Sequence, residues 1–142
     1  NFANNPAIAL FIPLIGGTGG NVGIQSSAIV VQGLANGSLD LRKSLSQIVK
    51  ELGLALINAS IISLLVFAYN FFIFHPDFKI TIAVSASLFA VVLFAATFGT
   101  FVPLTLEKMK VDPAIATGPF ITITNDIIGM MIYMTVCMML LQ

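Results

Sequence analysis

The chain has 142 residues, of which 8% are charged, whereas roughly 25% of the residues of an ordinary soluble domain are charged. Hydrophobic residues make up 58%, and so few charges cannot cover the surface of a soluble domain of this length. The net charge is zero and there is no basic stripe, which argues against nucleic-acid binding. The composition therefore predicts an all-α membrane protein, a polytopic bundle of transmembrane helices embedded in a lipid bilayer.

Several long segments of the chain contain no charged residue. A membrane-spanning helix needs about 20 mostly apolar residues, so the chain has room for about four spans. No low-complexity tract or soluble linker separates the spans, so we expect a single domain over residues 1–142. We expect spans at about Ala7–Leu34, Gly53–Phe74 and Ile80–Leu106 and from Ala114 to the C-terminus, with a charged amphipathic stretch at Ser38–Leu52.

The third span has Gly99 and Pro103 near its end, which predicts a kink or a stop there. The loops after the first and third spans hold five basic residues, and the loop between the second and third holds only Lys79. Cytoplasmic loops carry the excess of Lys and Arg, so we expect both basic loops in the cytoplasm and both termini outside. An N-terminus outside the cell suggests a further helix upstream of this chain.

Asp126 is the only ionisable side chain near the middle of the last span. A charged Asp at the centre of a membrane helix costs about 2.5–3.5 kcal/mol on insertion scales, so such residues usually face water or a partner. A neutral Asp126 bonded to a neighbouring helix is the alternative. Small or polar neighbours on the same face of this apolar helix favour a water-filled path; they are Pro119, Thr122, Asn125, Gly129 and Tyr133.

The first span has glycines and small polar residues in its middle, PLIGGTGGNVGIQSS at residues 13–27. This run lacks the Lys-Ser/Thr pair of a phosphate-binding loop and the third glycine of a dinucleotide fingerprint, so we expect no nucleotide site. The pairs Gly16/Gly20 and Gly19/Gly23 permit close helix packing. Asn21 and the other polar side chains exceed what packing needs, and a hydrated cation path is the second interpretation. We expect this segment to meet the last span.

Pro119 and the methionines of the last span each have two interpretations. Pro119 inside a helix would free carbonyl groups near Ile115 for water or a cation, whereas at a helix start it is a favourable first-turn residue. Met130, Met134 and Met138 recur every four residues and could pass Cu(I), although flexible apolar packing is much commoner.

The groups around Asp126 are carboxylate, hydroxyl, amide and backbone oxygens, which suit hard cations without choosing among Na⁺, Mg²⁺, Mn²⁺ and Ca²⁺. Mg²⁺ usually keeps several waters while touching one or two carboxylates. Two-fold symmetry would place two copies of Asp126 around one hydrated ion. We expect no catalytic residue, because an intramembrane aspartyl protease needs two membrane Asp residues in one chain.

Two segments resemble the transmembrane domain of the MgtE family of magnesium channels and transporters. Residues 13–27 resemble its glycine-rich pore helix, and residues 98–133, FGTFVPLTLEKMKVDPAIATGPFITITNDIIGMMIY, resemble its last two helices. The resemblance covers essentially the whole chain, which looks like helices two to five of the family's five. It departs from the family at Ile24, where many members carry Asn, and at Thr122, where Ala is common.

The resemblance implies a homodimer with a pore on the two-fold axis, lined by the first and last spans of this chain. Asp126 corresponds to the acidic residue that binds Mg²⁺ through retained waters. The backbone of the glycine-rich turn and the carbonyl one helical turn before Asp126 are expected to face that ion. The expected pore-lining or backbone contacts are Gly17, Gly20, Asn21, Thr122, Asn125 and Gly129.

The sequence therefore predicts a multi-pass protein of a bacterial cytoplasmic membrane that moves hydrated Mg²⁺, and other divalent cations such as Mn²⁺ or Co²⁺. Cytoplasmic regulatory domains of the family are absent from this chain. The alternative is a secondary divalent-metal transporter coupled to H⁺ or Na⁺, in which Asp126 is the shared site. Glycine and proline breaks in helices suit that mechanism too.

Overall fold

The computed structural model describes residues 5–141, which form helices joined by short loops and contain no strand. Four segments are long and apolar enough to cross a membrane: Pro6–Ala35, Leu41–Phe74, Phe78–Lys108 and Pro119–Leu141. The α-helices within them are α1 (Pro6–Leu10), α2 (Ile12–Ala35), α3 (Ser44–Tyr69), α4 (Phe78–Lys108) and α5 (Pro119–Leu141). The predicted all-α architecture with four spans is confirmed.

One residue, Phe11, separates α1 from α2, next to Pro13, whose ring and missing N–H disfavour a continuous helix at this point. From Ile12 to Ala35 the helix is uninterrupted. The glycine-rich run is therefore helical along its whole length, in agreement with its resemblance to a glycine-rich pore helix. Its backbone carbonyls are engaged in the helix, while its glycines expose a surface without side chains.

Helix α3 begins earlier than predicted, because the amphipathic stretch before Gly53 is part of the same helix. A 3-10 turn, Leu41–Lys43, leads into it, and Asp40 caps that turn through the backbone N–H of Lys43. At its other end α3 continues into a single π-helical turn, Asn70–Phe74. Most side chains on the middle of α3 are exposed apolar groups, which suits contact with lipid.

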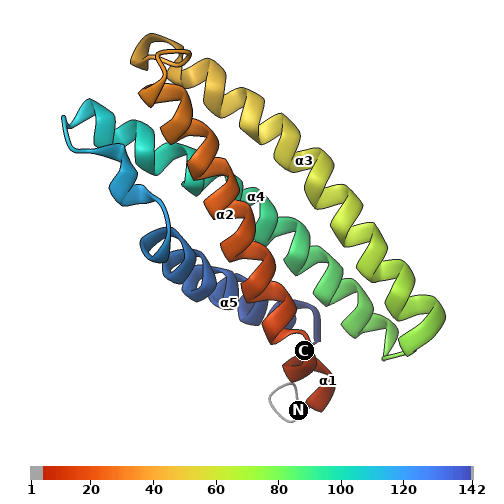
Figure 1. Cartoon of the computed structure of the whole chain (residues 1–142). Coiled ribbons are helices and arrows are strands. Elements are labelled where there is room, and N and C mark those ends of the chain that lie inside the picture. Colours follow the sequence, from red (N-terminus) through yellow and green to blue (C-terminus); the bar gives the residue numbers. More distant parts are fainter. Residues whose placement is uncertain (1–4, 142) are drawn as a thin grey trace.

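Helix α4 is the central helix of the bundle and packs against α2, α3 and α5 (Figure 1). Pro103 lies inside α4 and is buried, and the helix continues to Lys108. Of the two predicted outcomes at Gly99 and Pro103, a stop does not occur, and a kink stays a prediction. The core between α4 and its neighbours contains Ile15, Val84, Leu88, Val91 and Tyr133, among others.

The two ends of the bundle carry different charges. The α2–α3 and α4–α5 connections lie together at one end, whereas the α3–α4 turn, α1 and the end of α5 lie at the other (Figure 1). Arg42, Lys43, Lys108 and Lys110 are at the first end, which we call the basic end. Its placement in the cytoplasm stays a prediction from the distribution of basic residues.

Polar contacts join distant parts of the chain at both ends. At the basic end, the hydroxyl of Ser27 on α2 donates to the carbonyl oxygen of Ala116, 2.7 Å away, in the 3-10 turn Pro113–Ala116 before α5. At the other end, the hydroxyl of Tyr133 donates to the carbonyl oxygen of Ile8 at 2.8 Å. Both bonds are buried; the first ties α2 to the turn before α5, and the second ties α5 to α1.

Gly99 of α4 lies directly against the backbone of α2. Replacing it by alanine should lower the free energy of unfolding by about 1–3 kcal/mol, the usual cost of overpacking, because the new Cβ would collide with the carbonyl oxygen of Gly23. Gly53→Ala is the control, since a Cβ there meets nothing within 4 Å and alanine is favoured over glycine in a helix by about 1 kcal/mol. Thermal unfolding in detergent should show only Gly99→Ala destabilised. Equal stability of the two variants would contradict the close contact.

Candidate functional site

Two rows of glycines on α2 face different neighbours. Gly19 and Gly23 point toward α4 and the inner side of α5, because a Cβ on Gly19 would lie 2.9 Å from Val91 and one on Gly23 would collide with the side chain of Asn125. Gly16 and Gly20 point toward Asp126 of α5. The predicted close packing of helices at these glycines is confirmed, and the predicted meeting of the first and last spans occurs here.

Asp126 lies against the second row of glycines. A Cβ on Gly20 would be 2.9 Å from Asp126 Oδ1 and 3.2 Å from the methyl carbon of Thr122, whereas a Cβ on Gly16 would be 3.8 Å from the same oxygen. The Asp126 side chain is half-buried, and its Oδ1 is buried without a hydrogen-bond partner among residues 5–141. The alternative of an aspartic acid bonded to a neighbouring helix therefore finds no support in these contacts.

Asn125 and Gly129 lie on the inner side of the α2–α5 contact, toward α4. Asn125 is fully buried over Gly23, and both polar atoms of its side chain lack a partner within the described residues. Gly129 faces Val91, whose side chain would be 3.3 Å from an added Cβ. The structure therefore separates these two residues from the open side of the contact, although the sequence pattern grouped them with Asp126.

Gly17 and Asn21 lie on the open side. Each follows a residue that faces Asp126, and successive residues of a helix are rotated by about 100°. Both are exposed, and a Cβ on Gly17 would meet nothing within 4 Å. Thr122 is half-buried one turn before Asp126, and its hydroxyl donates to the carbonyl oxygen of Gly118 at 3.1 Å. Asp126 therefore sits at an edge of the α2–α5 contact that opens away from α4.

Pro119 is the first residue of α5, so its two interpretations are resolved in favour of the helix start. Gly118 before it has a φ of 72°, a left-handed conformation that favours glycine. The carbonyl oxygen of Ala116 is not free, because it accepts the hydrogen bond from Ser27. The turn at Gly118 therefore sets where α5 begins and where Asp126 lies along the bundle. No break inside the helix is involved.

Asp126 offers a cation a single carboxylate as its charged ligand. Within residues 5–141 no group of three or more His, Cys, Asp or Glu side chains could hold a metal ion. A cation at Asp126 would therefore be bound by a single carboxylate per chain, supplemented by water and neutral oxygen atoms. That is the coordination that Mg²⁺ accepts, because it dehydrates reluctantly.

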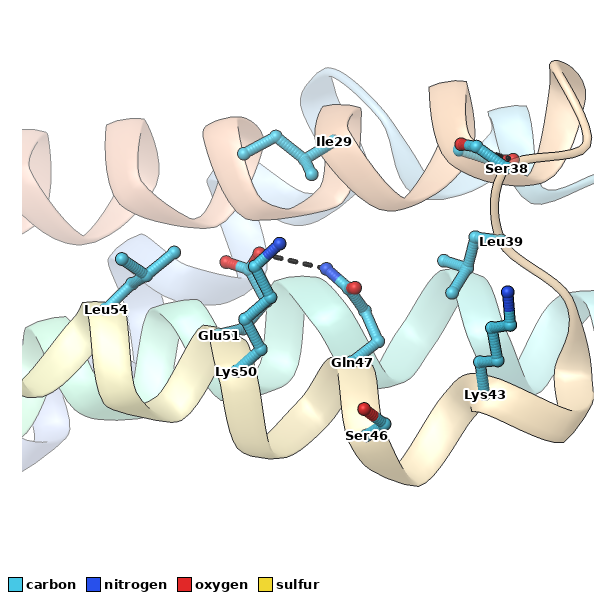
Figure 2. Close-up of a pocket in the computed structure, with 10 residues that line it drawn as sticks. Ile29, Ser38, Leu39, Lys43, Ser46, Gln47, Lys50, Glu51 and Leu54 are labelled. Carbon is cyan, nitrogen blue, oxygen red and sulfur yellow. Dashed lines mark hydrogen bonds between the residues drawn. The ribbon is translucent and has the colours of Figure 1, made fainter.

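One buried acidic residue was missed by the sequence interpretation. Glu51 of α3 is only 5% exposed, yet it lies in the stretch that was read as an amphipathic, charged surface. It borders a groove between α2 and α3 together with Gln47 (Figure 2). The available signal was the spacing of Gln47, Glu51 and Asn58, which places polar groups on one side of a helix that is otherwise apolar.

Comparisons with known proteins show the family to which the chain is similar. The sequence model of the MgtE family, described as a divalent cation transporter, matches residues 12–136. "Magnesium transporter MgtE" of Thermus thermophilus is 34% identical over 136 residues, which are 96% of this chain and 30% of that protein. The protein of the same name from Bacillus subtilis is 35% identical over 127 residues, 89% of this chain and 28% of its own length.

A third magnesium transporter MgtE, from Enterococcus faecalis, is 29% identical over 139 residues, 95% of this chain and 30% of that protein. The chain therefore spans less than a third of the length of each of these relatives. The relatives are named as transporters, in agreement with the expectation that the chain is not an enzyme. Because the family model matches most of its length, the chain belongs to the MgtE family of divalent cation transporters.

Proposed function

We propose that this chain is a membrane domain that conducts hydrated Mg²⁺, and other divalent cations of similar chemistry, along a path bordered by α2 and α5, with Asp126 as the ion-binding residue. The observation that carries the proposal is the buried Asp126 Oδ1, which has no partner among the described residues and lies against Gly16 and Gly20. The names of the relatives support Mg²⁺ as the transported ion.

The glycines explain how a hydrated ion fits beside a helix in this bundle. A side chain at Gly20 would collide with the Asp126 carboxylate, whereas one at Gly17 would extend into the open side. An ion that keeps its waters needs the open side next to Gly17, and its waters can donate to carboxylate, amide and carbonyl oxygens. Asn21 and Thr122 border the same edge and supply such groups.

A second copy of the chain completes the proposed path. One chain offers a single carboxylate at one edge of the α2–α5 contact, and a two-fold axis along that edge places two Asp126 residues around one ion. The exposed face of α5 next to this edge is apolar, with Ile127 and Met131 each more than half exposed, so it suits burial against another copy or lipid. We therefore infer a homodimer, with the pore between the protomers.

The proposed setting is the cytoplasmic membrane of a bacterium, with the basic end in the cytoplasm. The positive-inside distribution of Lys and Arg supports this orientation. A membrane potential that is negative inside favours inward movement of a divalent cation. Transport down this gradient needs no second ion.

Replacing Asp126 by asparagine should reduce Mg²⁺ uptake at least about tenfold, because the amide keeps the shape but removes the negative charge that attracts the ion. Uptake into liposomes containing purified protein measures the effect. Asp77→Asn is the control, since Asp77 is an exposed cap of α4 and asparagine caps equally well. Normal uptake by folded Asp126→Asn protein would remove this residue from the mechanism.

Gly20→Ala should also impair uptake, because its Cβ would come within 2.9 Å of Asp126 Oδ1 and displace the carboxylate. Gly16→Ala is a matched control on the same face of α2, where the added Cβ would be 3.8 Å from that oxygen, an ordinary contact. We expect a loss of several-fold for Gly20→Ala and little change for Gly16→Ala, measured in the same liposomes. Equal activities would show that this carboxylate position does not matter.

The alternative is a secondary transporter in which H⁺ or Na⁺ shares Asp126 with the metal ion. The Asp126 carboxylate oxygen without a partner among the described residues is open to a monovalent as well as a divalent cation, which is the observation that favours this alternative. We expect Mg²⁺ flux to follow the Mg²⁺ gradient and membrane potential alone. Flux that appears only when a pH or Na⁺ gradient is imposed on the liposomes would favour the coupled mechanism.

A further inference from the structure

A groove runs between α2 and α3 near the basic end. It consists of two adjoining hollows, an outer one of about 480 Å³ and an inner one of about 220 Å³, and both are bordered by Ile29, Glu51 and Leu54. The groove exists because α3 packs along α4 and has little direct contact with α2. Neither hollow borders Asp126 or Gly20, so the groove is separate from the α2–α5 site.

Glu51 projects from α3 toward α2 in this groove (Figure 2). Its Oε1 accepts a hydrogen bond of 3.0 Å from Nε2 of Gln47, one helical turn earlier. Oε2 is not among the buried polar atoms without a partner, although the residue as a whole is only 5% exposed. Because Glu51 lines both hollows, this second oxygen is accessible from the groove.

The two hollows differ in charge. The outer one is bordered by Lys43 and Lys50, whereas the inner one has no basic side chain in its lining. The polar groups of the inner hollow all offer oxygen atoms: the Glu51 carboxylate, the Ser26 hydroxyl and the amides of Gln25 and Asn58. A carboxylate together with neutral oxygen ligands is the donor set of a hard divalent cation.

We propose that this inner hollow is a second binding site for a hydrated divalent cation, with Glu51 as its charged ligand. At about 30 Å³ per water molecule, 220 Å³ corresponds to about seven waters, enough for an octahedral ion that keeps most of its hydration shell. Gln25, Ser26 and Asn58 are positioned to accept hydrogen bonds from those waters.

The second site lies nearer the basic end than Asp126. Ser26 is six residues beyond Gly20 on α2, which at 1.5 Å per residue is about 9 Å along the helix axis. Binding in the α2–α3 groove does not require Asp126, so this inference goes beyond the proposed conduction path. A failure of one proposal leaves the other standing.

Lys50 is the natural competitor for the cation, because it borders the outer hollow next to Glu51. An ammonium group near the carboxylate lowers the local affinity for a metal ion. Removing the Lys50 ammonium should therefore raise the affinity for the cation, whereas removing the Glu51 carboxylate should lower it. The test can use both changes.

The test measures Mn²⁺ binding to the detergent-solubilised chain by electron paramagnetic resonance. All variants carry Asp126→Asn, which removes the carboxylate of the first site. Mn²⁺ is a suitable probe because it shares the preference of Mg²⁺ for oxygen ligands. We expect binding to persist in Asp126→Asn, to weaken roughly tenfold or more when Glu51→Gln is added, and to strengthen when Lys50→Met is added instead. Glu107→Gln on α4 borders neither hollow and is the control.

Glu51 is buried, and its replacement can disturb folding, so Asn58→Leu provides a second variant. Asn58 is exposed on α3 and borders only the inner hollow, so its loss should weaken Mn²⁺ binding without unfolding the chain. Undiminished Mn²⁺ binding in Glu51→Gln, or in Asn58→Leu where Glu51→Gln does not fold, would overturn the proposal. So would the loss of all binding in Asp126→Asn alone.

Discussion

The structure depends on the two rows of glycines along α2, where side chains are absent. Gly19 and Gly23 let α4 and Asn125 approach the α2 backbone, and on α4 Gly99 does the same from the opposite direction. In a bilayer, helices gain little from the hydrophobic effect when they associate, so close packing and polar contacts must hold them together. The same lack of side chains at Gly16 and Gly20 leaves the Asp126 carboxylate next to bare backbone. Packing and the candidate site thus have one structural cause.

The four spans could be predicted because charges are expensive inside a bilayer and their positions bound each apolar segment. Asp126 could be predicted for the same reason, as a single charge in a long apolar run. Helix limits were less accessible: α3 extends back to Ser44 because an amphipathic stretch can continue a helix, and Pro103 does not end α4. Local sequence indicates where a helix is weakened, whereas tertiary packing decides whether it continues.

The sequence pattern did not show which residues of α5 lie on the open side of the α2–α5 contact. Small and polar residues line both the interior of a membrane bundle and its water-filled surfaces, so Asn125, Gly129 and Asp126 looked alike. Val91 distinguishes them, because its side chain fills the inner side next to Gly129. Glu51 was missed for the converse reason: a charged residue near a helix end resembles a solvated one, although the folded chain buries it.

The attachment of α3 to the rest of the bundle has a mechanical consequence. Its packing is almost entirely against α4, and the hydroxyl of Ser63 fixes it there by donating to the carbonyl oxygen of Ser85 at 2.7 Å. Tilting α3 about that bond would widen or narrow the groove that holds Glu51 while leaving the α2–α5 pair undisturbed. A force applied at Leu41–Lys43, the 3-10 turn that leads into α3, would therefore tilt α3 about Ser63 and change the width of the groove.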